Sequence, residues 1–285
     1  MLGEPLSGEA NAILELLFES GAILRREFHR AGGPRGYGGH ADVDGEVEEF
    51  LRDRLRSAFP HDGFLGEETG SYEGLSGRRW IVDPNDGTSE FLKGYRGASV
   101  SIALVEAGQP VLGGVFSYVA PDDDGDLIIG GPGLGLFRGT RSQIEPKAVA
   151  CSIHQSRPER TATVAISSRA ARDQTLLEAN AERCRPWQPR PVVGIAYRLA
   201  LAAAGDVQVA TTLTAPWSWD MAGGHALLRG AGADLFTRGG DPVTYDTAGH
   251  CTYSPAYFGG PWRLVKVLLE RDWETLMVGR PGRRA

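Results

Sequence analysis

Apolar side chains recur at helical spacing in two segments near the N-terminus. The first segment runs from Ala10 to Phe28 and the second follows Asp44, a residue type suited to capping a helix. Their apolar positions are Ile13, Leu16, Leu17, Ala22 and Leu24, then Val47, Phe50, Leu51, Leu55 and Phe59. The pattern predicts two amphipathic helices joined by a glycine-rich loop over residues 31–41.

The middle of the chain changes to short apolar runs broken by glycine, proline and aspartate, which is typical of strands. The runs are Phe64–Leu65, Trp80–Val82, Ser99–Val105, Val111–Tyr118 and Leu127–Ile129. The glycine-rich segment Gly130–Gly139 that follows is interpreted as turns.

The second half of the chain alternates strand-like and helix-like segments. Strands are expected at Ala162–Ile166, Val207–Thr211 and Ala233–Thr237, and helices at Thr175–Cys184, Ile195–Ala204, Trp219–Leu228 and Trp262–Leu276. No long linker separates the halves, so we expect an N-terminal α+β lobe (1–146) and a C-terminal α/β lobe (147–285) packed as one compact unit.

Composition narrows the classes of function. The 285 residues carry a net charge of −6. Tight binding of a nucleic-acid polymer requires a basic surface, so such polymers are not expected as partners. The most apolar helix segment, Ile195–Ala204, is too short for a bilayer, so membrane insertion is not expected. The three cysteines (151, 184 and 251) are far apart and the N-terminus does not read as a signal peptide, which together favour a cytoplasmic location.

Carboxylates gather in the segment that follows Trp80. The apolar run leads into Asp83-Pro84-Asn85-Asp86-Gly87-Thr88, and Gly66-Glu67-Glu68 lies shortly before it. Hard cations such as Mg²⁺ take clustered oxygen ligands of this kind. If Gly87 and Thr88 open a helix, their N–H groups would also suit a phosphate. The alternative is an ordinary acidic turn, because Asp-Gly is common in hairpins.

A second acidic position stands at the start of a predicted helix. Asp220 follows Trp219 and precedes the small residues Ala222, Gly223 and Gly224, which allow close helix packing. Simple N-capping is the alternative interpretation of Asp220.

Together these motifs resemble the inositol monophosphatase superfamily, whose signatures are a Glu-Glu step, Asp-Pro-(Ile/Leu)-Asp-Gly-Thr and a later Trp-Asp at a helix start. Residues 41–51 and 99–115 are also similar to the family. The segment Asp86–Lys93 most resembles the 3'(2'),5'-bisphosphate nucleotidase branch. The resemblance implies an αβαβα sandwich of the sugar-phosphatase type and a metal-dependent phosphoric monoester hydrolase.

The resemblance also implies a role for each matching residue. Ligands of two Mg²⁺ ions, for which Mn²⁺ can substitute, would be Glu67, Asp83, the Asn85 carbonyl, Asp86 and Asp220. Glu67 and Thr88 would orient the attacking water, and Gly87 and Thr88 would hold phosphate oxygens. Asp44 and Glu68 would be outer ligands of a third ion; hydrogen bonding around the site or a solvated helix start is the alternative.

Two residues depart from the family where the substrate's alcohol portion should bind. Arg198 ends the segment Gly194–Arg198, where the nucleotidase branch has a Gly-Ser-Ser-x-Lys pattern. Trp217 lies shortly before Asp220, in a segment that lacks the acidic or arginine residue found there in relatives. Trp217 could stack on a base, although core packing is the favoured interpretation.

The expected substrate is a small-molecule phosphate ester of the nucleotide 3'(2')-phosphate type. Inositol, histidinol or sugar monophosphates are the alternative, and a catalytically silent binding protein is the rival from another class. A homodimer is expected by analogy with the family alone.

Overall fold

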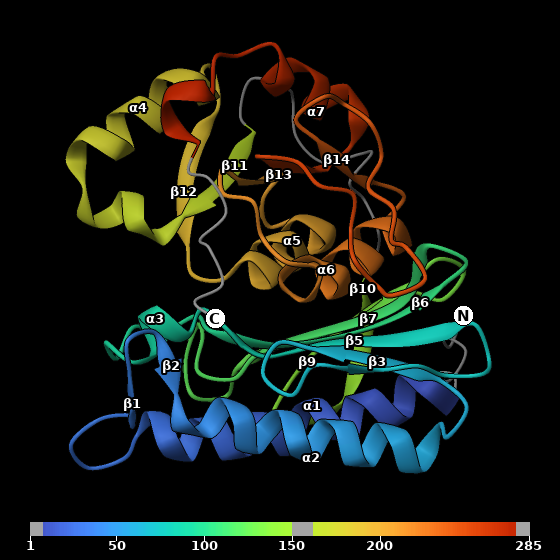
Figure 1. The fold of residues 1–285 in the computed structure, drawn as a ribbon. Coiled ribbons are helices and arrows are strands. Elements are labelled where there is room, and N and C mark those ends of the chain that lie inside the picture. The colour runs from blue at the N-terminus through green and yellow to red at the C-terminus, as the bar shows by residue number, and fades with distance from the viewer. Residues whose placement is uncertain (1–7, 150–161, 278–285) are drawn as a thin grey trace.

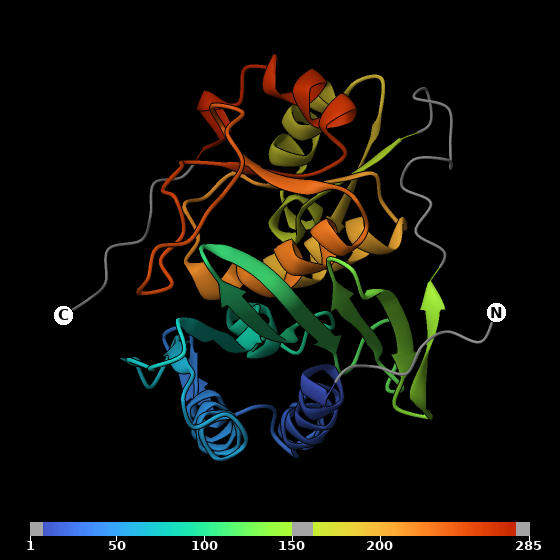
Figure 2. The same cartoon turned by 90° about the vertical axis from the view of Figure 1, so that its right-hand side faces the viewer.

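The computed structural model describes residues 8–149 and 162–277, and its N-terminal part is two helices beneath a sheet. Helices α1 (Gly8–Phe28) and α2 (Asp42–Ala58) lie side by side, and Figure 2 looks along them. Their apolar faces are buried against the sheet, as the spacing predicts. A short hairpin, β1 (Gly36–Tyr37) and β2 (His40–Ala41), replaces part of the expected loop.

The N-terminal sheet has eight strands in the order β10-β9-β8-β7-β6-β5-β3-β4. It is antiparallel except where β3 pairs with β5. The strands are β3 (Gly63–Gly66), β4 (Ser71–Tyr72), β5 (Arg78–Asp86), β6 (Ser99–Glu106), β7 (Gln109–Ser117), β8 (Asp126–Gly131), β9 (Gly135–Thr140) and β10 (Gln143–Val149).

The C-terminal sheet has five strands in the order β12-β11-β13-β15-β14. They are β11 (Thr163–Ser167), β12 (Gln188–Val192), β13 (Val209–Thr212), β14 (Asp234–Thr237) and β15 (Tyr257–Gly260). Helices α5 (Ile195–Ala204) and α6 (Ser218–Gly230) lie between the two sheets, and α4 (Gln174–Cys184) and α7 (Trp262–Leu269) cover the outer face (Figure 1). The layers therefore run α, β, α, β, α, which confirms the expected fold class.

Small residues let the middle helices pack closely on both sides. A Cβ on Gly223 would overlap the Ser101 hydroxyl of β6, and one on Gly224 would overlap Leu199 of α5. Since α6 cannot carry larger side chains at these points, its N-terminus is held tightly against the N-terminal sheet. This packing brings Asp220 near the end of β5.

Several sequence expectations about element boundaries are wrong. Helix α2 begins at Asp42 with Ala41 as its N-cap, so Asp44 lies inside the first turn with a buried side chain. Residues 135–140 are not turns but strand β9, because pairing with β8 satisfies their backbone groups. The last helix ends at Leu269, and only a short 3-10 turn, η3 (Glu274–Leu276), follows it.

None of the helices in residues 8–149 and 162–277 combines the length and the apolarity needed to cross a membrane. Strand β10 belongs to the N-terminal sheet and continues to Val149. The lobe boundary at residue 146, the homodimer and the cytoplasmic location stay predictions. Cys151 lies outside the described residues.

Candidate active site

Three carboxylates meet where the two halves of the molecule touch. Oxygen atoms of Asp83, Asp86 and Asp220 all lie within 4.8 Å of one another. Asp83 and Asp86 are on β5, and Asp220 is the third residue of α6. Residues three apart on a regular strand face opposite sides, but the register between β5 and β6 shifts between Asp83 and Asp86. This irregularity allows both carboxylates to face Asp220.

The cluster concentrates negative charge in a buried place. Burial, together with neighbouring carboxylates, raises the pKa of Asp83 well above its ordinary value. Burial raises the pKa of Asp86 to about 6, although the N–H of Ala196 opposes this rise. Asp83 Oδ2 has no hydrogen-bond partner within residues 8–149 and 162–277. A buried carboxylate oxygen of this kind is costly unless it binds a cation, so the donor set fits a hard divalent metal.

Glu67 faces the same cluster from the loop after β3. It is half-buried, and burial followed by the charge on Asp220 raises its pKa to about 9. The side chain of its neighbour Glu68 is 24% exposed, with Oε1 4.0 Å from Nδ1 of His40, and burial raises its pKa. The structure therefore groups Glu67 with the three aspartates electrostatically and places Glu68 at the edge of this group, beside His40.

Two helix N-termini contact the carboxylates. The N–H of Ala196, in the first turn of α5, donates to Asp86 Oδ2 at 2.6 Å. The N–H of Trp217, which precedes α6, donates to Asp220 Oδ2 at 2.5 Å. The positive ends of these helix dipoles offset part of the cluster's negative charge. The N-cap of α6 is Trp217, so the N-cap interpretation of Asp220 is wrong: Asp220 lies in the first turn, accepts from the N-cap N–H and belongs to the cluster.

A hydrogen-bonded network supports the β5 side of the cluster. Asn85 Nδ2 donates to Asp44 Oδ1 at 2.9 Å, and Asn85 N–H donates to Asp83 Oδ1 at 2.8 Å. The Thr88 hydroxyl lies 2.9 Å from both Asp44 Oδ2 and the Asn85 carbonyl oxygen. Tyr118 donates to Asn85 Oδ1 at 2.5 Å. Asp44 is therefore a hydrogen-bond acceptor for Asn85 and Thr88, and burial raises its pKa to about 7.

Gly87 and Thr88 form the turn that follows the cluster. Gly87 has φ 103° and caps the four-residue helix α3 (Thr88–Phe91). A Cβ at Gly87 would lie 2.9 Å from Val193 Cγ1, so both the backbone angle and the space require glycine. Phosphate binding by Gly87 and Thr88 stays a prediction.

Two residues that support the site, Glu48 and Tyr118, were not predicted from the sequence. The Glu48 side chain is fully buried on α2, and its Oε1 accepts from the Thr69 N–H at 2.6 Å and the Glu68 N–H at 3.0 Å. It therefore fixes the loop that carries Glu67. A signal exists for Glu48: it lies four residues after Asp44, three before Leu51 and seven before Leu55, so it shares their face of the helix. Tyr118 follows a strand and offers no comparable signal.

The two candidate substrate residues lie beside the cluster. Arg198 on α5 is 6% exposed; its Nε donates to the Gly194 carbonyl at 2.9 Å and Nη1 donates to the Thr211 carbonyl. Burial lowers the pKa of Arg198 to about 10. The Trp217 ring is half-buried and stacks on Trp219, with centroids 5.3 Å apart. This arrangement agrees with core packing for Trp217.

Residues 9–273 match the profile of the Inositol monophosphatase family. The chain belongs to the inositol monophosphatase family. Its relatives include an inositol-1-monophosphatase of Bacillus subtilis, 30% identical over 72% of this chain and 74% of that protein. A histidinol-phosphatase of Chlorobaculum parvum is 30% identical over 73% of this chain and 76% of that protein.

Solved structures share the fold of this chain. The extragenic suppressor protein suhB from Bartonella henselae matches with a TM-score of 0.73 and 23% identity, over 93% of this chain and all of that chain. The family and these relatives are phosphatases, so this chain is a phosphatase of the same family. Metal dependence is typical of the family, and the acidic cluster is present.

Proposed function

We propose that the protein hydrolyses a small-molecule phosphate monoester with the help of Mg²⁺. The observation that carries this proposal is the cluster of Asp83, Asp86 and Asp220, whose buried charge and unpartnered Asp83 Oδ2 suit a divalent cation. The ligands would be these three carboxylates, the Asn85 carbonyl and Glu67. When bound, Mg²⁺ polarises the phosphoryl group and lowers the pKa of a bound water.

The chain's own groups would position that water and the phosphate. Thr88 Oγ1 donates to Asp44 or the Asn85 carbonyl, which leaves its oxygen lone pair to accept a proton of the water. A bound cation would offset the neighbouring negative charges that raise the pKa of Glu67, so its carboxylate would be free to orient the water and take a proton as the water oxygen bonds to phosphorus. The bond between phosphorus and the alcohol oxygen then breaks, and inorganic phosphate and the alcohol leave.

On the identity of the alcohol, we propose a nucleotide-type 3'(2')-phosphate first. Inositol, histidinol and sugar phosphates are the alternative substrates, because relatives of this chain are named for the first two. Base stacking on Trp217 does not support the nucleotide, since that ring is stacked on Trp219. The positive charge of Arg198 beside the site is the feature that favours an alcohol with a further negative group.

Phosphate release tests the proposal directly. The protein would be assayed with Mg²⁺ against nucleoside 2'- and 3'-phosphates, inositol 1-phosphate, histidinol phosphate and sugar phosphates, with EDTA-treated protein as the control. We expect Mg²⁺-dependent release from at least one ester, with nucleotides giving the highest kcat/KM. Release that persists without a metal would overturn the metal mechanism, and no release from any ester would favour a silent binding protein.

A further inference from the structure

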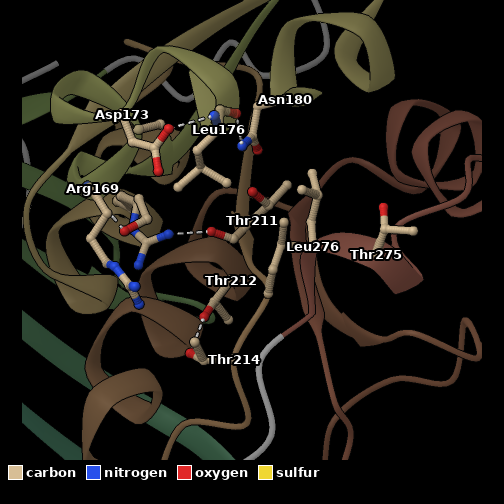
Figure 3. Close-up of a pocket in the computed structure, with 13 residues that line it drawn as sticks. Arg169, Asp173, Leu176, Asn180, Thr211, Thr212, Thr214, Thr275 and Leu276 are labelled. Carbon is tan, nitrogen blue, oxygen red and sulfur yellow. Dashed lines mark hydrogen bonds between the residues drawn. The ribbon is translucent and has the colours of Figure 1, made fainter. Parts of the chain in front are cut away.

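A cavity of about 280 Å³ opens at the carboxyl ends of β11 and β13 (Figure 3). These strands are parallel neighbours in the sheet. The chain leaves β11 toward α4 on the outer face and leaves β13 toward α6 on the inner face. Ligands of open α/β sheets bind where connections diverge in this way. The position alone therefore indicates a binding cavity.

The cavity adjoins the carboxylate cluster through shared wall elements. Arg198 lines it and donates to the Gly194 carbonyl at the start of α5, where the Ala196 N–H binds Asp86. Thr212 and Thr214 line it on the segment that leads into α6 and Asp220. An ester held at the cluster by its phosphate would extend its alcohol portion toward this cavity.

The charged side chains that line the cavity are two arginines and one aspartate. The Arg198 guanidinium donates to two carbonyl oxygens, and its charge is partly offset by Asp86 and Asp220, which lie outside the lining. Arg169 is exposed, on the 3-10 turn η2 (Ser168–Arg172), and its guanidinium makes no hydrogen bond or ion pair within residues 8–149 and 162–277. Asp173 is the lining carboxylate, and its Oδ1 accepts from the Leu176 N–H to cap α4.

The other side chains that line the cavity are both polar and apolar. Figure 3 shows Arg169 on one side of the cavity and Asn180 and Thr275 on the other, with Leu276 between threonines. The hydroxyl and amide groups would suit a polyol. A neutral polyol, however, would leave the Arg169 guanidinium without an ionic partner, and an alcohol that carries an ammonium group would be repelled by it.

We infer that this cavity selects phosphate monoesters whose alcohol portion carries a second anionic group, and that Arg169 is a specificity-determining residue for it. The inference rests on the proposed function and names the substrate class of the same site. A carboxylate and a second phosphate share the required chemistry, because a guanidinium can bind either with two parallel hydrogen bonds.

A matched series of six-carbon esters tests the inference. Glucitol 6-phosphate has a neutral far end, 6-phosphogluconate has a carboxylate there, and glucitol 1,6-bisphosphate has a second phosphate. We would measure kcat and KM for each with Mg²⁺ in the wild type, Arg169→Ala, Arg169→Lys and Arg190→Ala. Arg190 is an exposed arginine on β12 outside this cavity, so it controls for loss of surface charge.

The expected result is a wild-type preference for the anionic esters that Arg169→Ala lowers about tenfold, through KM. Arg169→Lys should retain part of the preference, and Arg190→Ala all of it. A preference for the bisphosphate without one for 6-phosphogluconate would identify a second phosphate as the group bound. Hydrolysis without any preference, or an equal loss on all three esters in Arg169→Ala, would overturn the inference while the proposed function stands. Absence of release from these three esters while a nucleotide is hydrolysed would also overturn the inference alone, and absence of release from the nucleotides as well would overturn both.

Discussion

The two sides of the carboxylate cluster are built by different means. On the N-terminal side, Asp83 to Thr88 are consecutive, and they are held by side-chain hydrogen bonds donated to Asp44 and by one donated from Tyr118. On the C-terminal side, the N-termini of α5 and α6 arrive from separate parts of the chain, and backbone N–H groups make the contacts. The first side is a fixed set of reactive groups, and the second adds helix dipoles and a cavity with excess positive charge.

The largest effect should come from a ligand on the first side. Asp86→Asn keeps the shape of the side chain but removes a charge from the cluster, so kcat for phosphate release should fall at least about a hundredfold. Asp53→Asn, on an exposed position of α2, makes the same change as a control. A near-normal kcat in a folded Asp86→Asn protein would show that the wrong carboxylates have been chosen.

A smaller loss is expected from the network behind the ligands. Asp44→Asn places an amide where the Thr88 hydroxyl and the Asn85 amide both donate, so one hydrogen bond is lost. We expect kcat to fall about tenfold, since one hydrogen bond to a charged group is removed. Asp42→Asn, in the same first turn but exposed, is the matched control. Equal kcat in the two variants would exclude a role for Asp44 in positioning Thr88.

Stability of the metal-free protein should depend on pH through the same carboxylates. The pKa of Asp86 is raised from 3.8 to about 6, so between these values the folded state binds more protons than the unfolded state. The stability of the metal-free protein should therefore fall as pH rises from about 4 through about 6. Melting temperatures measured across this range should show a flatter profile in Asp86→Asn. A metal-free protein that gains stability over this range in both forms would contradict the pKa shift.

The smallest effect on catalysis is expected at Trp217. Removing its ring in Trp217→Ala deletes the stack on Trp219, which should lower stability by about 1–2 kcal/mol. kcat/KM for a nucleotide and for p-nitrophenyl phosphate should change by the same factor. A KM that rises for the nucleotide alone would instead show that Trp217 contacts a base.

The sequence predicted the first side of the site better than the second. Asp83, Asp86 and Thr88 stand in one motif, so their proximity follows from local chain geometry. The Ala196 N–H at Asp86 depends on how α5 packs between the sheets, and nothing in the local sequence encodes that contact. Arg169 lies far from every motif, and it reaches the same cavity as Arg198 because β11 and β13 pair in parallel.

The fold shows the same division between local and tertiary information. The helices α1 and α5 follow their apolar spacing closely. Strand β12, with Pro189 and Pro191, and the glycine-rich strand β15 have compositions that argue against strands. They form because their neighbours supply the pairing: β12 is an edge strand, and β15 lies between β13 and β14.

Titration of metal-stripped protein with Mg²⁺ tests the central claim most directly. Phosphate release from the best ester of the panel would be followed as Mg²⁺ is added back to EDTA-treated wild type and Asp86→Asn. The account predicts no turnover without metal, recovery with added Mg²⁺ in the wild type, and little recovery in the variant. Full turnover in the stripped wild-type protein would contradict it.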